Sequence, residues 1–172
     1  MTAPILHTDR LTLSPPTAAD LDDEAAMWAD PAVYAMIGGR AFSREEVWHR
    51  LLRYIGHWQV CGYGTWVVRT RDGRFAGSVG LMDSRRASDP SFEGTPEAGW
   101  AFAGSAHGNG YAREALTALF AWTDAQGIAR TVCIIDPANA PSIRLAERLG
   151  HRLVTEATYR DTPTLLFERT RP

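Results

Sequence analysis

The chain has 172 residues, of which 45% are hydrophobic and 22% are charged, and its formal net charge is −2 at pH 7. This length suits one domain with a sizeable core, and the mixed charges, without a basic face or tail, argue against a nucleic-acid-binding protein. No apolar run approaches the ~18 residues that a membrane span needs, and Met1–Arg10 does not resemble a secretion signal. Cys61 and Cys133 form no CxxC pair, so we expect neither a disulfide framework nor a zinc site. These features predict a single cytoplasmic domain over residues 1–172 that binds no metal, nucleic acid or membrane.

The N-terminal part of the chain predicts one short strand and two helices. Residues 11–13 alternate like a strand and are followed by a pair of prolines, which cannot continue a ladder. A helix over 17–28 is indicated by a threonine cap and by acidic residues in its first turns. Ser43 and Glu46 have the spacing of a capping box, and apolar residues at helical spacing over 47–58 predict the second helix.

The middle of the chain has the pattern of strands. Residues 64–69 and 75–82 are strand-like, and the Asp72-Gly73 pair between them is a strong hairpin signal. A polar stretch over 83–95 is typical of a long loop. A third strand is predicted over 97–103.

Helices and strands alternate in the C-terminal half. Thr131–Ile135 is a β-branched run, as expected of a strand buried on both faces. Asn139 can cap the helix that follows, and Gly150 ends it. The remaining predicted elements are a helix over 110–126 and two strands over 152–157 and 164–169. Together the elements predict one α/β domain without a linker.

A glycine-containing turn, His107–Ala112, lies between a predicted strand and a long helix. Small residues here let the backbone bend tightly, and the helix N-terminus behind them adds a partial positive charge, so the turn suits an anionic phosphate. A Walker A loop would end in Gly-Lys-Ser/Thr, and a dinucleotide fingerprint would place a third glycine where Arg113 stands. Both are rejected, and a purely structural turn remains the alternative.

This part of the sequence resembles a known family. Glu97–Trp100 followed by Ala106–Ala115 is similar to the coenzyme A-binding segment of the GNAT N-acetyltransferases, written (Q/R)-x-x-G-x-(G/A). Gly110 and Ala112 occupy its last two marked positions, and His107 replaces the usual first Gln or Arg. The resemblance covers essentially the whole chain.

Two further segments resemble the RimJ/RimL-like branch of that family. Ile135–Ser142, with the helix to Gly150, is similar to the N-x-x-S motif of the branch, and Thr8–Leu13 with Ala29–Pro31 is similar to its N-terminal segment. The resemblance implies a mixed, mostly antiparallel sheet, splayed open in the middle and flanked by about four helices.

The resemblance also implies a binding mode for acetyl-CoA. The pantetheine arm would pair with main chain near Ala101 and Phe102, as an added strand would, and the pyrophosphate would meet N–H groups from Gly108 to Arg113. The expected cofactor-binding residues are Ala101, Phe102, Ala103, His107, Gly108, Asn109, Gly110, Tyr111, Ala112, Arg113 and Asn139.

Acetyl transfer to an amine requires a base, because an ammonium group has no lone pair for attack, and the departing thiolate gains from an acid. Glu97 is the candidate base, since it begins the strand that would end beside the thioester; Glu156 and Asp161 are weaker candidates. Ser142 is the candidate acid because it occupies the serine of the branch motif. Tyr159 is the alternative, since many members of the family use a tyrosine.

The sequence therefore predicts an acetyl-CoA-dependent N-acetyltransferase that acts on a small amine or on a protein N-terminus. A catalytically silent acyl-CoA-binding module is the alternative, and it would need neither Glu97 nor Ser142. The sequence leaves open which amine is acetylated and whether the protein is a monomer or a homodimer.

Overall fold

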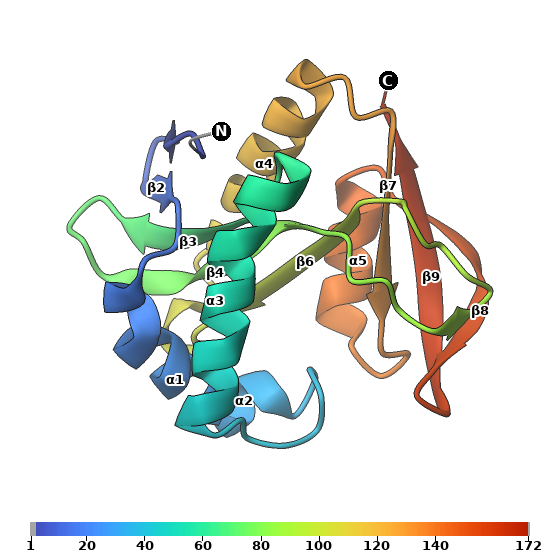
Figure 1. Cartoon of the computed structure of the whole chain (residues 1–172), viewed down its shortest axis with the longest axis horizontal. Coiled ribbons are helices and arrows are strands. Elements are labelled where there is room, and N and C mark those ends of the chain that lie inside the picture. Colours follow the sequence, from blue (N-terminus) through green and yellow to red (C-terminus); the bar gives the residue numbers. More distant parts are fainter. Residues whose placement is uncertain (1–2, 172) are drawn as a thin grey trace. The chain divides into compact units, whose positions relative to one another are not determined.

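The computed structural model describes residues 3–171, which form two compact units (Figure 1). Unit 1 comprises residues 3–80 and 100–119, and unit 2 comprises residues 81–99 and 120–171. A single domain over the whole chain stays a prediction.

The described residues contain nine strands, five α-helices and two short 3₁₀ helices. The strands are β1 (Leu6–His7), β2 (Leu11–Ser14), β3 (Thr65–Thr70), β4 (Phe75–Met82), β5 (Ser88–Asp89), β6 (Glu97–Phe102), β7 (Arg130–Ile135), β8 (Arg152–Tyr159) and β9 (Thr162–Thr170). The helices are η1 (Ala18–Asp20), α1 (Leu21–Ala29), α2 (Pro31–Tyr34), α3 (Arg44–Cys61), η2 (Gly104–Ala106), α4 (Tyr111–Ala125) and α5 (Ala140–Arg148). None of the helices in residues 3–171 has both the length and the apolar character that crossing a membrane would require.

Unit 1 contains a run of antiparallel strands in which β1 pairs with β2, β2 with β3 and β3 with β4. The hairpin of β3 and β4 (Figure 1) confirms the strands predicted on either side of Asp72-Gly73. In this turn Gly73 has a φ of +87°, the left-handed conformation that glycine adopts without steric cost.

Helix α3 begins at its expected cap, whereas the helix predicted over 17–28 begins as the 3₁₀ helix η1 after Thr17 and continues as α1. Ser43 Oγ accepts from the N–H of Glu46 at 3.2 Å, and the Glu46 carboxylate accepts from the N–H of Ser43 at 2.8 Å, which confirms the capping box of α3. The expectation of about four helices missed the short helix α2. Asp30 Oδ1 caps it through the N–H of Ala32 at 2.9 Å, and Pro31 occupies the first turn, where its missing N–H costs nothing.

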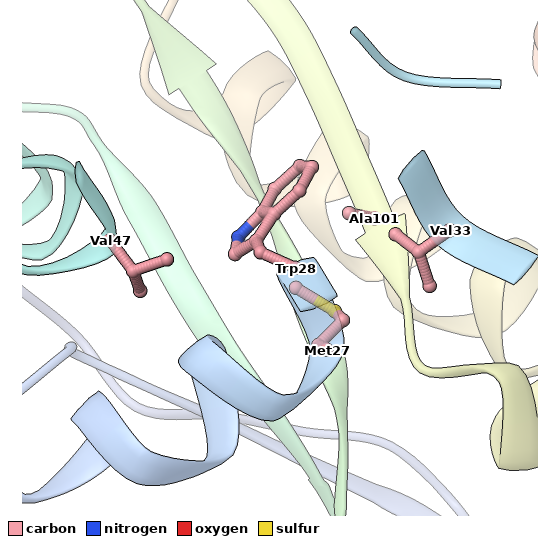
Figure 2. Packing of buried hydrophobic residues seen from close by; sticks show 5 residues of the cluster. All are labelled: Met27, Trp28, Val33, Val47 and Ala101. Carbon is pink, nitrogen blue, oxygen red and sulfur yellow. The ribbon is translucent and has the colours of Figure 1, made fainter. Parts of the chain in front are cut away.

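Trp28 occupies the centre of a buried cluster in unit 1, with Val47 of α3 on one side and Val33 and Ala101 on the other (Figure 2). The same tryptophan donates from Nε1 to the carboxylate of Glu24 at 3.0 Å. That carboxylate is 1% exposed and also accepts from the hydroxyl of Ser78 on β4. Burial raises the pKa of Glu24, against the effect of these hydrogen bonds.

Strand β4 passes unusually close to β6 at Gly77. A Cβ atom at this residue would lie 2.2 Å from the carbonyl oxygen of Ala101 and 2.8 Å from Cα of Phe102. A side chain cannot occupy this space, so glycine is required for the two backbones to approach.

Unit 2 is built around β7, which lies between a parallel and an antiparallel neighbour. It pairs in parallel with β6 at Glu97 and Val132, and antiparallel with β9 along its whole length. Strand β9 pairs antiparallel with β8, and β8 with β5. Within residues 3–171, Glu97 and Val132 are the sole registered pair of β6 and β7. The predicted fold class, a mixed, mostly antiparallel and open α/β sheet, is confirmed.

The strands β8 and β9 confirm the closing pair predicted from the sequence. They are joined at Arg160 and Asp161, whose φ values are +51° and +58°. Strand β5, inside the predicted loop over 83–95, is an addition, because its two residues give no readable alternation.

Candidate functional site

The turn before α4 has the shape expected of a phosphate-binding loop. Gly108 and Gly110 have φ values of +75° and +77°, and residues 107–110 are all exposed. Nothing lies within 4 Å of a Cβ atom built on Gly108. The turn leads directly into the 15 residues of α4, so backbone N–H groups and the positive end of the helix dipole are available there to an anion.

Side chains of the turn fix its conformation by bonding to nearby carbonyl groups. His107 Nε2 lies 2.8 Å from the carbonyl oxygen of Phe102. Asn109 Nδ2 donates to the carbonyl oxygens of Ala106 and His107, at 3.3 and 3.0 Å. These side chains bond to backbone carbonyl oxygens and not to backbone N–H groups, so they do not compete with an anion for the N–H groups of the turn.

Arg10 and Glu114 form a clamp beside the turn, which the sequence analysis missed. Arg10 donates from Nε to Oε2 of Glu114 at 2.7 Å and from Nη1 to the carbonyl oxygen of Asn109 at 2.9 Å. The backbone N–H of Arg10 and the hydroxyl of Thr8 donate to Oε1 of the same carboxylate, at 2.9 and 2.6 Å. Burial opposes ionisation of Glu114, but these hydrogen bonds outweigh it and lower its pKa. The only sequence signal for this contact is the resemblance of Thr8–Leu13 to the family, and that resemblance does not point to a role for Arg10.

Strand β6 carries Ala101 and Phe102, the residues predicted to pair with pantetheine. Both are buried, at 5% and 6% exposure. The N–H of Ala103 donates to the carbonyl oxygen of Ala76 at 2.9 Å, and the carbonyl of Phe102 is bonded to His107. These two main-chain groups therefore already have partners within unit 1.

Glu97, the predicted base, is a buried carboxylate paired with an arginine of unit 2. Its side chain is 4% exposed, and Oε2 accepts from Nε of Arg86 at 2.7 Å. Arg86 also lies over the ring of Tyr159, with Cζ 4.8 Å from the ring centroid. Burial opposes the charge of Arg86, but the hydrogen bond to Glu97 prevails and raises the pKa of the guanidinium. Pattern reasoning missed Arg86, because no local signal links it to a glutamate eleven residues away.

The other carboxylates considered as bases stand in different surroundings. Glu156 on β8 and Asp161 in the turn after it are both exposed. Cys133, whose side chain is buried at 1% exposure, is not a nucleophile candidate, because burial and the nearby Glu97 raise its pKa. Glu97 is thus the buried carboxylate among the three predicted candidates.

The start of α5 holds Asn139 and Ser142 in fixed geometry. Asn139 is 8% exposed, and its Oδ1 accepts from the N–H of Ser142 at 3.2 Å, which confirms the predicted helix cap. Ser142 is half-buried in the first turn of the helix. The cap involves the backbone N–H of Ser142 and not its hydroxyl.

The predicted site residues thus belong to two groups, one in each unit. Unit 1 brings together the glycine turn, His107 and the clamp, while unit 2 brings together Glu97, Arg86 and Tyr159 and places Asn139 beside Ser142. No group of three or more His, Cys, Asp or Glu within residues 3–171 could hold a metal ion.

The sequence and the structure are similar to those of other bacterial proteins. A protein of unassigned function from Bacillus subtilis (strain 168), YkkB, is 31% identical over 113 residues, which span 63% of each chain. A structure from Bordetella pertussis, named for the GnaT family of acetyltransferases, is 35% identical, with a TM-score of 0.86 over 98% of this chain and 100% of its own. The yncA structure from Salmonella typhimurium, which contains acetyl-CoA, shares the fold at 21% identity, with a TM-score of 0.72 over 94% of both chains.

The family match agrees with the features built up from the residues. Residues 10–152, which include the glycine turn, Glu97 and Ser142, match the family described as the acetyltransferase (GNAT) domain. The mixed, open sheet is the fold of the Bordetella pertussis structure. The chain belongs to the GNAT acetyltransferase family.

Proposed function

We propose that the protein transfers the acetyl group of acetyl-CoA to a primary amine, by direct attack of the amine in a ternary complex. The observation that carries this proposal is the exposed turn over residues 107–110 at the N-terminus of α4, in a chain of the GNAT family. The acetyl-CoA in the yncA structure, which has the same fold, supports the same donor here.

The turn would bind the pyrophosphate of the donor. N–H groups from Gly108 to Arg113, together with the helix dipole, favour a doubly negative group. Asn109 and the clamp of Arg10 and Glu114 hold the turn in this conformation before the donor arrives. The turn therefore needs little reordering on binding, which lowers the entropic cost of association.

The arm of the donor would follow β6 and the start of α5. Main chain of Ala101 to Ala103 and the side chain of Asn139 would contact it. Since the N–H of Ala103 and the carbonyl of Phe102 already have partners, pairing would use the other main-chain groups of this segment. Contact with Asn139 would use its Nδ2, because Oδ1 caps α5.

Glu97 would act as the base and Ser142 as the acid. Glu97 would take the proton from the acceptor ammonium, directly or through a water molecule, and the neutral amine would attack the thioester carbonyl. The new C–N bond forms and the C–S bond breaks, and Ser142 would give its proton to the leaving thiolate. The second proton that the nitrogen loses as the amide forms would replace the proton of Ser142, directly or through water. Tyr159, which contacts Arg86, is the alternative acid.

We further propose that the chain belongs to the RimJ/RimL-like branch and acts in the cytoplasm. The motif from Asn139 to Ser142 and its observed helix cap support the branch. Within residues 3–171 neither Cys61 nor Cys133 is part of a disulfide bond, which suits a reducing compartment.

Thiol release from acetyl-CoA tests the proposal when it is measured across a panel of amines with mass analysis of the products. The panel contains amino acids, peptides with free N-termini, polyamines and aminoglycosides. We expect one class to gain a single acetyl group at the amine. Calorimetric binding of acetyl-CoA without turnover of any amine would identify a silent acyl-CoA-binding module instead.

A further inference from the structure

Arg86 and Glu97 form a buried pair of opposite charges at the residue proposed as the base. The side chains are 22% and 4% exposed, and the nitrogen and oxygen lie 2.7 Å apart. A buried carboxylate is tolerated when a counter-charge is present, and Arg86 supplies it. With the pair intact, the charges of these two side chains offset each other before an acceptor arrives.

An acceptor amine disturbs that balance. Most amines are protonated at neutral pH, so the acceptor brings a positive charge to a place that already holds a guanidinium. Arg160 adds another guanidinium to the same ring, with Cζ 5.2 Å from the centroid of Tyr159. A simple cation would therefore meet repulsion as well as the attraction of Glu97. An acceptor that also carries an anionic group would offset this repulsion with a charge of its own.

Arg86 is suited to bind that group. Glu97 accepts from its Nε, and Tyr159 is a further hydrogen-bond partner of its side chain, but a guanidinium has five N–H donors and recognises a carboxylate through two of them at once. Its packing over the Tyr159 ring helps to hold the guanidinium in place. The neighbouring Arg85 differs, because its donors serve Asp83 and Glu93, at 3.0 and 2.8 Å, and its side chain is 67% exposed.

We propose that Arg86 is a specificity-determining residue that binds a carboxylate carried by the acceptor beside its amine. The acceptor is then an amino acid or a compound with the same arrangement, in which the ammonium faces Glu97 and the carboxylate faces Arg86. This inference rests on the proposed N-acetyltransferase activity and deepens it by naming the class of amine.

The test compares each amino acid with its own α-amide, which keeps the amine and removes the negative charge. For the wild-type protein we expect kcat/KM for the acid to exceed that for the amide at least about tenfold, after correction for the fraction of neutral amine at the assay pH. Arg86→Gln should reduce this preference about 10–100-fold, the effect of losing hydrogen bonds to a charged group. Arg86→Lys should keep part of it, since the charge remains while the two-donor geometry is lost.

Arg85→Gln is the matched control, because it removes the same charge from the next residue of the same loop, and it should leave the preference unchanged. An equal loss for acid and amide in Arg86→Gln would show that Arg86 only supports Glu97 and would overturn the inference. A wild-type protein that acetylates amides, polyamines or peptides as well as acids would overturn it too, without any variant, while the proposed activity would stand. Failure to acetylate any amine would instead refute the activity itself.

Discussion

Arg10 and Glu114 lie 104 residues apart in the sequence, and Nε of the arginine is 2.7 Å from Oε2 of the glutamate. The same arginine bonds to the carbonyl oxygen of Asn109, and its Cζ lies 4.9 Å from the centroid of the Tyr111 ring. The N-terminal segment is thereby tied to the turn that would hold the pyrophosphate, and the contact joins residues on both sides of Gly110.

Glu114→Gln should loosen this clamp, because the neutral amide accepts weakly from the arginine. We expect the KM for acetyl-CoA to rise roughly 3–10-fold and the free energy of unfolding to fall by about 1 kcal/mol. The lowered pKa of Glu114 means that the wild-type clamp persists at mildly acidic pH. Glu45→Gln, an exposed glutamate in the first turn of α3, is the control. An unchanged KM in Glu114→Gln would show that the clamp does not support the turn.

Gly110→Val should abolish most of the stabilisation that acetyl-CoA gives in a melting experiment. The variant places a β-branched residue at a φ of +77°, at a cost of about 1–3 kcal/mol, and crowds the proposed phosphate site. Gly127→Val is the matched control, because Gly127 has a φ of +76° and follows the C-terminal end of α4, whereas the turn precedes its N-terminal end. Both variants should lose intrinsic stability, but only Gly110→Val should lose the response to acetyl-CoA. If acetyl-CoA raised the melting temperatures of the two variants equally, the turn would not be part of the binding site.

Glu97→Gln should lower kcat/KM roughly 10²–10⁴-fold, because the amide cannot accept the proton of the acceptor. Acetyl-CoA affinity, measured by calorimetry, should stay nearly the same. Glu156→Gln, which changes an exposed carboxylate of β8, should have little effect. If the two variants behave alike, the base lies elsewhere or is water.

Ser142→Ala should lower kcat by no more than about 10²-fold and change the KM for acetyl-CoA less, because a thiolate leaves well without help. The helix cap should survive, since Asn139 bonds to the backbone N–H of Ser142. Steady-state kinetics and a melting curve of the same variant separate catalysis from stability. A normal kcat with a lowered melting temperature would exclude Ser142 as the acid, and Tyr159→Phe would then be the next variant to measure.

The buried side chain of His151 should make the stability of the protein depend on pH. Burial, aided by the nearby charge of Arg169, lowers its pKa to about 4, against 6.5 for a free histidine. Between these values the unfolded chain binds a proton that the folded chain does not, so stability should fall as the pH drops from about 6.5 to about 4. The contribution is of the order of 3 kcal/mol over that window. Denaturant titrations of His151→Leu should show a shallower dependence, whereas His49→Leu, at an exposed residue, should match the wild type.

Local signals in the sequence predicted most of the fold. The capping pair Ser43 and Glu46, the Asp72-Gly73 turn and the β-branched run of β7 each act through neighbouring residues, so each could be recognised without the structure. Helix α2 was missed because Pro31 also suits a break in the chain, and the deciding contact is the cap from Asp30.

The candidate site was less predictable because its polar contacts are not local. The glycine turn could be recognised from its own residues, and its left-handed glycines are observed. The partners of Glu97 and Glu114 lie in a loop and in the segment between β1 and β2, and the way these segments fold back is not encoded by periodicity. Long-range arginine contacts of this kind require coordinates.

The close approach of β4 and β6 at Gly77 also limits how this protein can vary. Even one methyl group at this residue would overlap the carbonyl oxygen of Ala101, on the strand proposed to receive the pantetheine arm. Relief would require the two backbones to separate, and a displaced Ala101 would no longer present its main chain in the same place. Residue 77 therefore has to remain a glycine for β4 and this part of β6 to keep their present positions.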